Sequence, residues 1–452
     1  LPHITMAIGL IFLLSPSGLL LRSVSPWLTG FDRPPNSYLF PDEYGFFLIL
    51  GLILKEIPFL ILVSLSALRE FSSSKFFDMG KSLQHSSFST WFILIFPIIY
   101  KKIRLVIFII IAFSSSVVDM SLLLAPSTPS TLSVRILQIF QSSDMDSFFI
   151  ASNLSLIQLF IIIILLIVWI FFENIIKLKF FYFFFIKITS FKSEFLKITI
   201  LCFSVILFLL SFMGIICSIL WGFSENWYFP NFFPNDLNIE NFLNFYYQNK
   251  SLILISIFIP LMVSLLSISL IILWVELLDY LNITKTQFEW IIFTPLFIPQ
   301  ISFLIGIQSF MIFFNFSSFL IPLIFVQLFY VIPYCFIILA PAMREVKSDY
   351  IKVASSLGKN RIVRLFKIKI PLVLPSLMTS FAIGMIVSFA LYVPVYFIGA
   401  GRVTTLTVEA LNLALSGSKQ DLGIATFFQI LFPTLLLFTV AFINRKTVKW
   451  QI

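Results

Sequence analysis

Charged residues are scarce in this chain. Asp, Glu, Lys and Arg make up 11% of its 452 residues, whereas hydrophobic residues make up 59%. A water-soluble fold of this length needs a surface rich enough in charge that roughly a quarter of all residues are charged. The composition therefore excludes a soluble globular protein. The net charge of +9 is then a signal about orientation in a membrane and does not point to nucleic acid.

Metal ligands and thiols are equally scarce, with two His and three Cys. His3 and His85 belong to no cluster with the spacing of a protein metal site, so none is expected. Cys202, Cys217 and Cys335 all fall in apolar runs, which predicts packing roles and no disulfide. The sequence also lacks a G-x-x-x-x-G-K-[ST] phosphate loop and any Ser-His-Asp arrangement. We therefore expect neither a catalytic site nor a bound cofactor in this chain.

Long apolar runs recur along the whole sequence. A helix needs about 20 such residues to cross the hydrocarbon core of a bilayer, whereas the strands of a barrel would be shorter and would alternate. The runs predict an all-α polytopic membrane protein with about ten spans. We place these spans at 4–21, 45–67, 104–125, 148–172, 198–221, 251–275, 290–312, 317–341, 374–396 and 423–443.

Two segments of the chain match each other without a gap, 78–97 (DMGKSLQHSSFSTWFILIFP) and 352–371 (KVASSLGKNRIVRLFKIKIP). The same register pairs further residues: Ser82-Leu83 with Ser356-Leu357, Pro97 with Pro371, Ser114 with Ser388, and Thr131-Leu132-x-Val134 with Thr405-Leu406-x-Val408. The start of the chain, LPHITMAIGL, similarly matches 298–307. These matches predict two related halves, 1–175 and 198–452, joined by a linker at 176–197.

The match at the start of the chain pairs it with the third span of a half that has six. We therefore expect that two spans are missing from the first half and that a full-length chain has about 12. The shift between the two matches is taken up by residues 22–44, a Pro-rich segment.

Lys and Arg gather on one side of the predicted spans. The opposite side holds only Arg22, Arg33, Arg135, Lys250, Arg402 and Lys419. By the positive-inside rule, the two repeated loops, 74–100 and 344–371, lie in the cytoplasm. The two halves are then parallel. For the aromatic and basic segment 173–197 we favour a helix lying in the membrane interface.

The second repeated loop carries small residues and a glycine. Ala354 and Ser355 would let another surface approach closely, and Gly358 suits a chain reversal that needs positive φ. Pro371 is suited to the start of the following helix. The positive charge of this loop, taken alone, is also typical of an ordinary cytoplasmic loop.

The spacing of this loop resembles a known motif. Lys352-Val353-Ala354, three further residues, Gly358 and the later Pro371 resemble the EAA loop of binding-protein-dependent ABC transporter permeases. In that family the loop forms a coupling helix that docks on the ATP-binding subunit. The resemblance implies that four residues make this contact in the second half, Ala354, Ser355, Leu357 and Gly358. The matching loop residues in the first half are Ser82, Leu83 and Pro97.

Both loops depart from the family pattern. Lys352 stands where the family has an acidic residue, and Gln84 stands where the first copy should have glycine. We therefore expect the two ATPase contacts to differ in strength.

Two permease halves in one chain resemble the fused subfamily that serves ferric iron and thiamine. Residues 27–35 (WLTGFDRPP) and 54–62 (LKEIPFLIL) are most similar to its uncharacterised thiamine-type branch. The resemblance implies the transmembrane domain of a type I importer that works by alternating access. A periplasmic binding protein would deliver a small solute, and two copies of a separate ATPase would bind magnesium and ATP.

Three charged residues lie inside predicted spans, where burial of charge is costly and usually functional. Lys55 and Glu56 are adjacent, and adjacent helical residues point about 100° apart, so they are not expected to face one neighbour. They either line an asymmetric path or are neutralised by separate partners. Asp119 is a further candidate and a potential partner of Lys55.

Two polar positions complete the candidate path, Ser114 and Gln300. Ser114 and the next two serines either line the path or bond to their own helix backbone. Gln300 matches His3 across the repeat, next to a proline in both copies. An alternative function uses the same charges: a proton-coupled secondary transporter in which Glu56 and Asp119 relay protons.

Overall fold

The described part of the chain is built from helices. The computed structural model describes residues 2–36, 40, 42–69, 73–82, 90–142, 144–185, 193–281, 283, 289–314, 318–346 and 348–451. Within these ranges the only pairing of extended backbone is a single bridge between Ser224 and Leu237. The fold is all-α and polytopic, as the apolar runs predict.

Eight segments among the described residues are long and apolar enough to cross a bilayer. They contain α1 (His3–Leu14) with α2 (Leu19–Val24), α3 (Phe46–Arg69), α9 (Met145–Phe185), α10 (Ser193–Phe223), α12 (Lys250–Tyr280), α14 (Leu320–Arg344), α17 (Ile370–Ala390) and α20 (Lys419–Gln451). A further candidate combines η2 (Glu289–Leu296) and α13 (Gln300–Phe313), which meet at an angle of 99°. Pro299 stands at this break, where proline ends one helix and suits the start of the next.

The span expected at 104–125 is divided in two. Helix α6 (Phe96–Ser116) begins earlier and carries Lys101 and Arg104 near its start, and α7 (Asp119–Leu124) is a separate short helix. Between them Val117 has an extended backbone, with ψ 135°. The serines before this break bond to carbonyls of their own helix, which weakens the helix end.

Helix α3, which carries the two adjacent charges, has a capped start. The Asp42 carboxylate accepts hydrogen bonds from the backbone N–H groups of Phe46 at 2.6 Å and Phe47 at 3.1 Å. Such a cap satisfies donors that the first helical turn leaves free. Desolvation raises the pKa of Asp42, but hydrogen bonds from the backbone outweigh it, so the pKa is lowered.

The order of elements repeats along the chain. Five elements of the first half each have a counterpart in the second half that begins 274 residues later. The pairs are η1 (Trp91–Ile95) and η3 (Leu365–Lys369), α6 and α17, α7 and α18 (Val393–Gly399), α8 (Leu132–Phe140) and α19 (Leu406–Ser416), and α9 and α20. The two matched threonines, Thr131 and Thr405, are the N-cap residues of α8 and α19. The ungapped internal repeat is thus confirmed by the element order.

The segment between the halves is helical in its described parts. Helix α9 continues without a break through residue 175 to Phe185, and α10 begins at Ser193. The interfacial helix favoured for 173–197 is therefore wrong at its start, because residues 173–185 extend a span. The domain boundaries at 175 and 198 stay a prediction.

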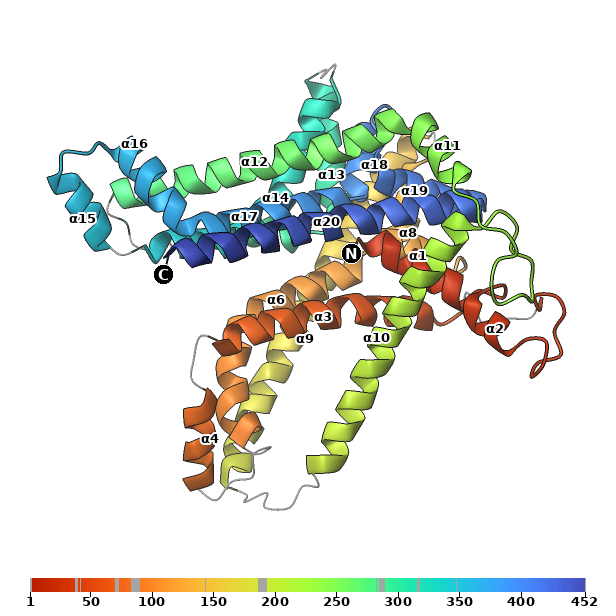
Figure 1. Cartoon of the computed structure of the whole chain (residues 1–452), viewed down its shortest axis with the longest axis horizontal. Coiled ribbons are helices and arrows are strands. Elements are labelled where there is room, and N and C mark those ends of the chain that lie inside the picture. Colours follow the sequence, from red (N-terminus) through yellow and green to blue (C-terminus); the bar gives the residue numbers. More distant parts are fainter. Residues whose placement is uncertain are drawn as a thin grey trace.

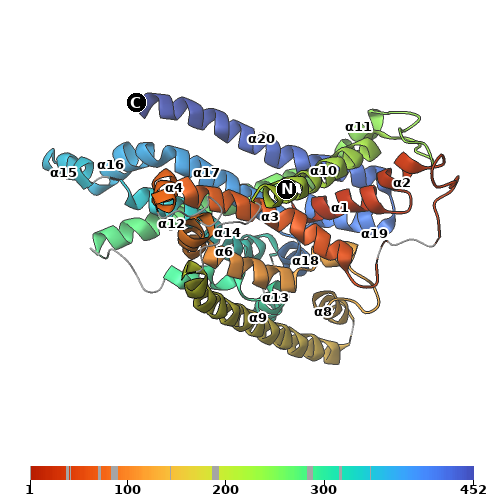
Figure 2. The ribbon, with the colours of Figure 1, turned by 90° about the horizontal axis from the view of Figure 1, so that it is seen from below.

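The two repeated loops lie toward one end of the molecule. Figures 1 and 2 show α4 (Ser73–Ser82) and α15 (Ser348–Ser356) at this end, while α2 and α11 (Glu240–Gln248) lie at the other. Parallel halves require this arrangement, because inverted halves would place the loops at opposite ends.

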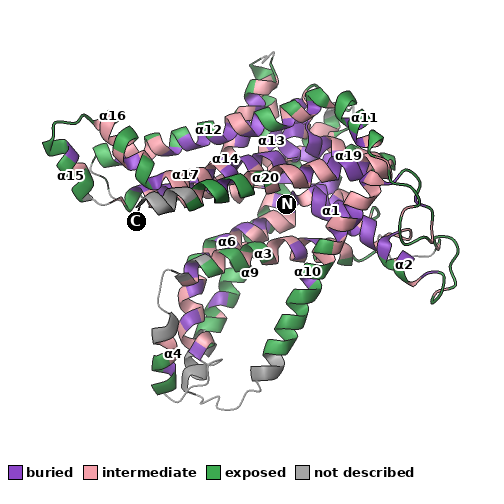
Figure 3. Cartoon of the chain, in the orientation of Figure 1, coloured by how far each residue is buried: buried purple, intermediate pink, exposed green. Residues whose placement is uncertain are grey.

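Helix α10 packs closely against both α1 and α20 through paired glycines. A Cβ added to Gly214 would lie 3.1 Å from the backbone of Gly9, and one added to Gly222 would lie 2.9 Å from the backbone of Gly423. Small residues let membrane helices approach to this distance. Figure 3 shows buried residues gathered around α1 and α19, while α10 is exposed along much of its length, as expected for a surface that faces lipid.

Candidate functional site

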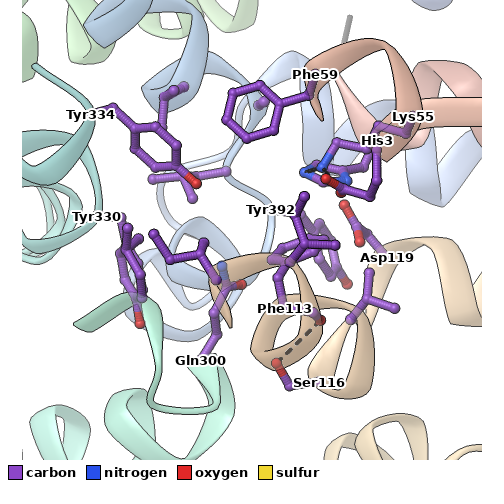
Figure 4. A pocket seen from close by; sticks show the side chains of 18 of the residues that line it. His3, Lys55, Phe59, Phe113, Ser116, Asp119, Gln300, Tyr330, Tyr334 and Tyr392 are labelled. Carbon is purple, nitrogen blue, oxygen red and sulfur yellow. Dashed lines mark hydrogen bonds and ion pairs between the residues drawn. The ribbon is translucent and has the colours of Figure 1, made fainter. Parts of the chain in front are cut away.

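A central cavity of about 520 Å³ lies between the two sets of matched helices (Figure 4). One wall comes from α1, α3, α6 and α7, and the opposite wall comes from η2, α13, α14, α17 and α18. This volume is within the range of small-molecule sites in proteins. The cavity is therefore large enough for a small solute.

The lining follows the internal repeat. Residues that are 274 positions apart line the cavity from opposite walls: Ile109 and Ile383, Phe113 and Val387, Ser116 and Ala390, Val117 and Leu391, Val118 and Tyr392, and Asp119 and Val393. His3 and Gln300, which the sequence pairs, also line it. The cavity thus lies where the two copies of the repeat face each other.

Lys55 and Glu56 both line the central cavity and form an ion pair with each other. The Lys55 ammonium donates to Glu56 Oε1 at 2.9 Å and lies 2.6 Å from His3 Nε2. It also lies 4.4 Å from the ring centroid of Phe113. The expectation that the two charges face different neighbours is therefore wrong, because the long lysine side chain bends back to its neighbour. Both residues line the cavity, and each is neutralised by the other and not by a separate partner.

Asp119 lines the same cavity, on the first turn of α7. Its side chain is 6% exposed, and its Oδ1 accepts a hydrogen bond from the backbone N–H of Met120 at 2.9 Å. The expected pairing with Lys55 is absent: among the described residues no cation lies within ion-pair distance of this carboxylate. Lys55 is instead taken by Glu56 and His3.

The two polar candidates have different positions. Gln300 lines the cavity at the start of α13, whereas Ser114 lies on α6 outside the lining. Ser116 takes the lining position, and its hydroxyl donates to the Ala112 carbonyl at 2.9 Å. The reading that these serines bond to their own helix holds for Ser115 and Ser116.

Sequence reasoning missed the aromatic side chains of the cavity. Five rings line it: Phe59, Phe113, Tyr330, Tyr334 and Tyr392. In the one-residue-shifted register that aligns Pro58 with Pro333, Lys55 falls on Tyr330 and Phe59 on Tyr334. This register pairs the positions, but in a chain with 58 Phe and 13 Tyr an aromatic residue carries little signal.

The second repeated loop is a pair of short helices around a glycine turn. Gly358 follows α15 with φ +73°, as its position predicts, and Lys359 N–H closes the turn on the Ala354 carbonyl at 3.1 Å. Leu357 is 69% exposed and Ser355 is also exposed. Ala354, which was expected at the contact, is only 5% exposed, so it packs within the loop instead.

The exposed apolar face of α15 includes two residues that the motif does not mark. Tyr350 is 53% exposed and Val353 is 59% exposed. With Leu357 they follow the helical spacing of three and four residues, which places them on one face. This face is available to a partner, whereas the small residue Ala354 lies behind it.

The first loop also has a small residue at the equivalent position, and neighbouring atoms lie closer to it. Gly80 occupies the position of Ala354, and a Cβ there would lie 2.0 Å from the Thr90 hydroxyl. Met79, the counterpart of Val353, is 53% exposed. The Ser82 hydroxyl donates to the Met79 carbonyl at 2.7 Å, and Leu83 lies outside the described residues.

The two matched prolines lie inside continuous helices. Pro97 and Pro371 follow the π-helical turns η1 and η3, and Ile370 N–H bonds to the Leu365 carbonyl five residues before it. Proline has no N–H to donate, and a wide turn accommodates the missing bond. Pro371 stands in the first turn of α17, as expected, but this helix is not a fresh start, because it continues from the loop through η3.

Charged residues connect the second loop to α12. Lys369 is 5% exposed, and its ammonium lies 2.5 Å from both Glu276 Oε1 and Asp279 Oδ2. Arg361 donates to the Glu276 carbonyl at 2.8 Å and lies 4.8 Å from the ring centroid of Tyr280. We call these five residues the loop anchor. Ile95 stands at the position of Lys369 in the first half.

Comparison with known proteins shows which proteins the chain is similar to. Residues 250–448 match the family described as the binding-protein-dependent transport system inner membrane component. Over 449 residues the chain is 24% identical to the inner membrane ABC transporter permease protein YnjC of Escherichia coli strain K12, an alignment that covers 98% of this chain and 79% of that relative. The ferric-iron and thiamine subfamily stays a prediction.

Proposed function

Because the chain belongs to the binding-protein-dependent ABC transporter permeases, we propose that its central cavity is the path of a small solute and that its two cytoplasmic loops couple this path to a separate ATPase. The chain is a multi-pass transport subunit of the bacterial inner membrane. The observation that carries the proposal is the position of the cavity between matched walls, with both loops toward one end.

Coupling in this proposal depends on the continuity of each loop with a cavity helix. Helix α15 leads through Gly358 and η3 into α17, which lines the cavity with residues near its far end. A displacement of α15 by an ATPase would therefore move the cavity wall directly. Alternating access follows if both halves move in this way when the ATPase subunits close on ATP.

The proposed partners follow from the family and the orientation. Two copies of an ATPase, each holding ATP and magnesium, would dock at 74–100 and 344–371. A periplasmic binding protein would deliver the solute to loops at the other end, within 22–44, 126–147, 222–250 and 397–422. This chain itself would bind no cofactor.

Affinity purification of the full chain from solubilised membranes tests the coupling. We expect a soluble ATPase at about two copies per chain, and we expect Gly358→Glu to abolish its recovery, because a side chain strains the positive φ and adds charge at the contact. Gly401→Glu is the matched control, since Gly401 has φ +74° and equally open surroundings in the opposite-side loop 397–422. Equal ATPase recovery from both variants would contradict the docking assignment.

The alternative of a proton-coupled carrier is favoured by one observation, the buried Asp119 without an ion-pair partner. It is tested in membrane vesicles that hold the chain. Uptake that stops when the proton gradient is removed but continues without ATP would establish the alternative. Uptake that needs ATP and persists without the gradient would exclude it.

A further inference from the structure

The charged groups of the central cavity do not balance. Only Lys55, Glu56 and Asp119 carry formal charge among the lining residues, one positive and two negative. The Lys55 ammonium nitrogen lies within hydrogen-bond distance of Glu56 and His3 and 4.4 Å from the ring centroid of Phe113. This cation is therefore already committed, and the remaining charge belongs to Asp119.

A buried carboxylate without an ion-pair partner is costly in this position. Asp119 is 94% shielded from solvent. Its Oδ1 accepts a hydrogen bond from the backbone N–H of Met120. Removing an ion from water without a partner is unfavourable by several kcal/mol. A positive ligand in the cavity would remove this cost, whereas a negative ligand would add to it.

The other wall of the cavity suits the body of such a ligand. Tyr330 and Tyr334 lie together there, and Figure 4 shows the Tyr334 hydroxyl directed toward the middle of the cavity, with Phe59 on the facing wall. The faces of aromatic rings attract cations, and organic ammonium groups are the best-suited ligands. The charged residues thus come from α3 and α7, and two of the three phenols come from α14.

Two buried polar atoms of the lining residues have no partner. Tyr330 is 2% exposed, and its hydroxyl has no hydrogen-bond partner. His3 Nδ1 is buried and also has no hydrogen-bond partner. A neutral His3 that accepts a hydrogen bond from the Lys55 ammonium through Nε2 carries its proton on Nδ1 and has a donor to spare. Buried polar groups in proteins are normally paired, so both atoms indicate a missing hydrogen-bonding partner.

We propose that the central cavity binds an organic cation, with Asp119 as the counter-ion and the aromatic rings around its body. This inference rests on the proposed function, because it names the solute class of the same path. A bare metal ion does not fit equally well, because the described residues include no group of three or more His, Cys, Asp or Glu that could hold one.

The test uses the full chain in nanodiscs of zwitterionic lipid and two probes of similar size. Benzyltrimethylammonium carries a positive charge beside a ring, and benzenesulfonate carries a negative one. Saturation-transfer NMR and calorimetry measure binding of each. We expect the cation to bind and the sulfonate not to bind. Asp119→Asn should weaken cation binding at least about tenfold, because it removes the buried counter-charge.

Three controls define what the result means. Asp146→Asn makes the same change on an exposed residue of α9 and should leave binding unchanged. Asp119→Glu keeps the charge and should retain binding. Asp119→Asn is isosteric and removes a buried charge, so it should fold, and thermal unfolding verifies this.

Other results would overturn the inference. Binding of neither probe would do so, as would cation binding that Asp119→Asn leaves unchanged. Binding of the sulfonate with loss on Lys55→Met would assign an anionic solute instead. None of these outcomes affects the comparison of ATPase recovery between Gly358→Glu and Gly401→Glu. Failure of the cation assignment is therefore distinguishable from failure of the proposed function.

Discussion

At the residue scale, the cavity wall contains a charge cluster whose members depend on one another. Lys55 neutralises Glu56, fixes the His3 ring through Nε2, and lies over Phe113, on which His3 also stacks at 4.6 Å between ring centroids. These residues come from α1, α3 and α6. The lysine is therefore a structural link between three helices as well as part of the lining.

Lys55→Met should destabilise the protein, because it leaves Glu56 ionised in a largely shielded site without its partner. We expect a loss of about 1–3 kcal/mol, measured as a lower thermal unfolding temperature in detergent. The double variant Lys55→Met/Glu56→Gln should recover part of this loss, since it removes the unpaired charge. A double variant that is no more stable than the single one would mean that Lys55 does not neutralise Glu56.

At the element scale, the loop anchor joins α12 to the second repeated loop. Lys369 lies in η3, at the end of the loop, and its two carboxylate partners lie near the end of α12. Breaking a buried ion pair is costly because the remaining charge is left without compensation. The anchor should hold α12 and the loop together when the loop is displaced.

Lys369→Met should reduce solute transport several-fold but lower ATPase recovery in the affinity purification only slightly, because α15 and its exposed face are intact. Transport and ATPase activity are measured on the same reconstituted complex. Lys367→Met is the control, since Lys367 lies two residues away and is exposed. Lys369→Arg should keep much of the transport. Loss of ATPase binding in Lys369→Met would assign the anchor to docking and not to transmission.

The anchor also marks a limit of prediction from the sequence. The matched prolines and the Thr-Leu-x-Val pair were enough to predict the repeat, because they recur at a fixed distance along the chain. The pairing of Lys369 with Glu276 spans 93 residues and has no counterpart in the first half, so no repeat could reveal it. Ala354 was misplaced for a similar reason: its small size predicts close packing but does not say which surface it packs against.

At the scale of the whole molecule, one chain holds two similar loops with different support. The second loop is attached to α12 by the anchor. The described part of the first loop relies on apolar packing of Phe76, Phe77 and Trp91 against Ala67 and Ile95. A firmly held docking helix loses less conformational freedom on binding, so it binds a partner more tightly.

A matched pair of substitutions tests this asymmetry. Val353 in α15 and Met79 in α4 are equivalent and exposed to a similar degree, 59% and 53%. Replacing each with Glu places a charge on the same face of its own loop. Because the second loop should contribute more binding energy, Val353→Glu should lower the amount of recovered ATPase further than Met79→Glu does. Quantitative mass spectrometry of the purified complexes measures the ratio of ATPase to chain.

Equal losses of ATPase from the two variants would mean that the two loops dock alike and that the anchor serves transmission alone. A larger loss from Met79→Glu would mean that the first loop, despite Gln84, is the principal site of ATPase docking.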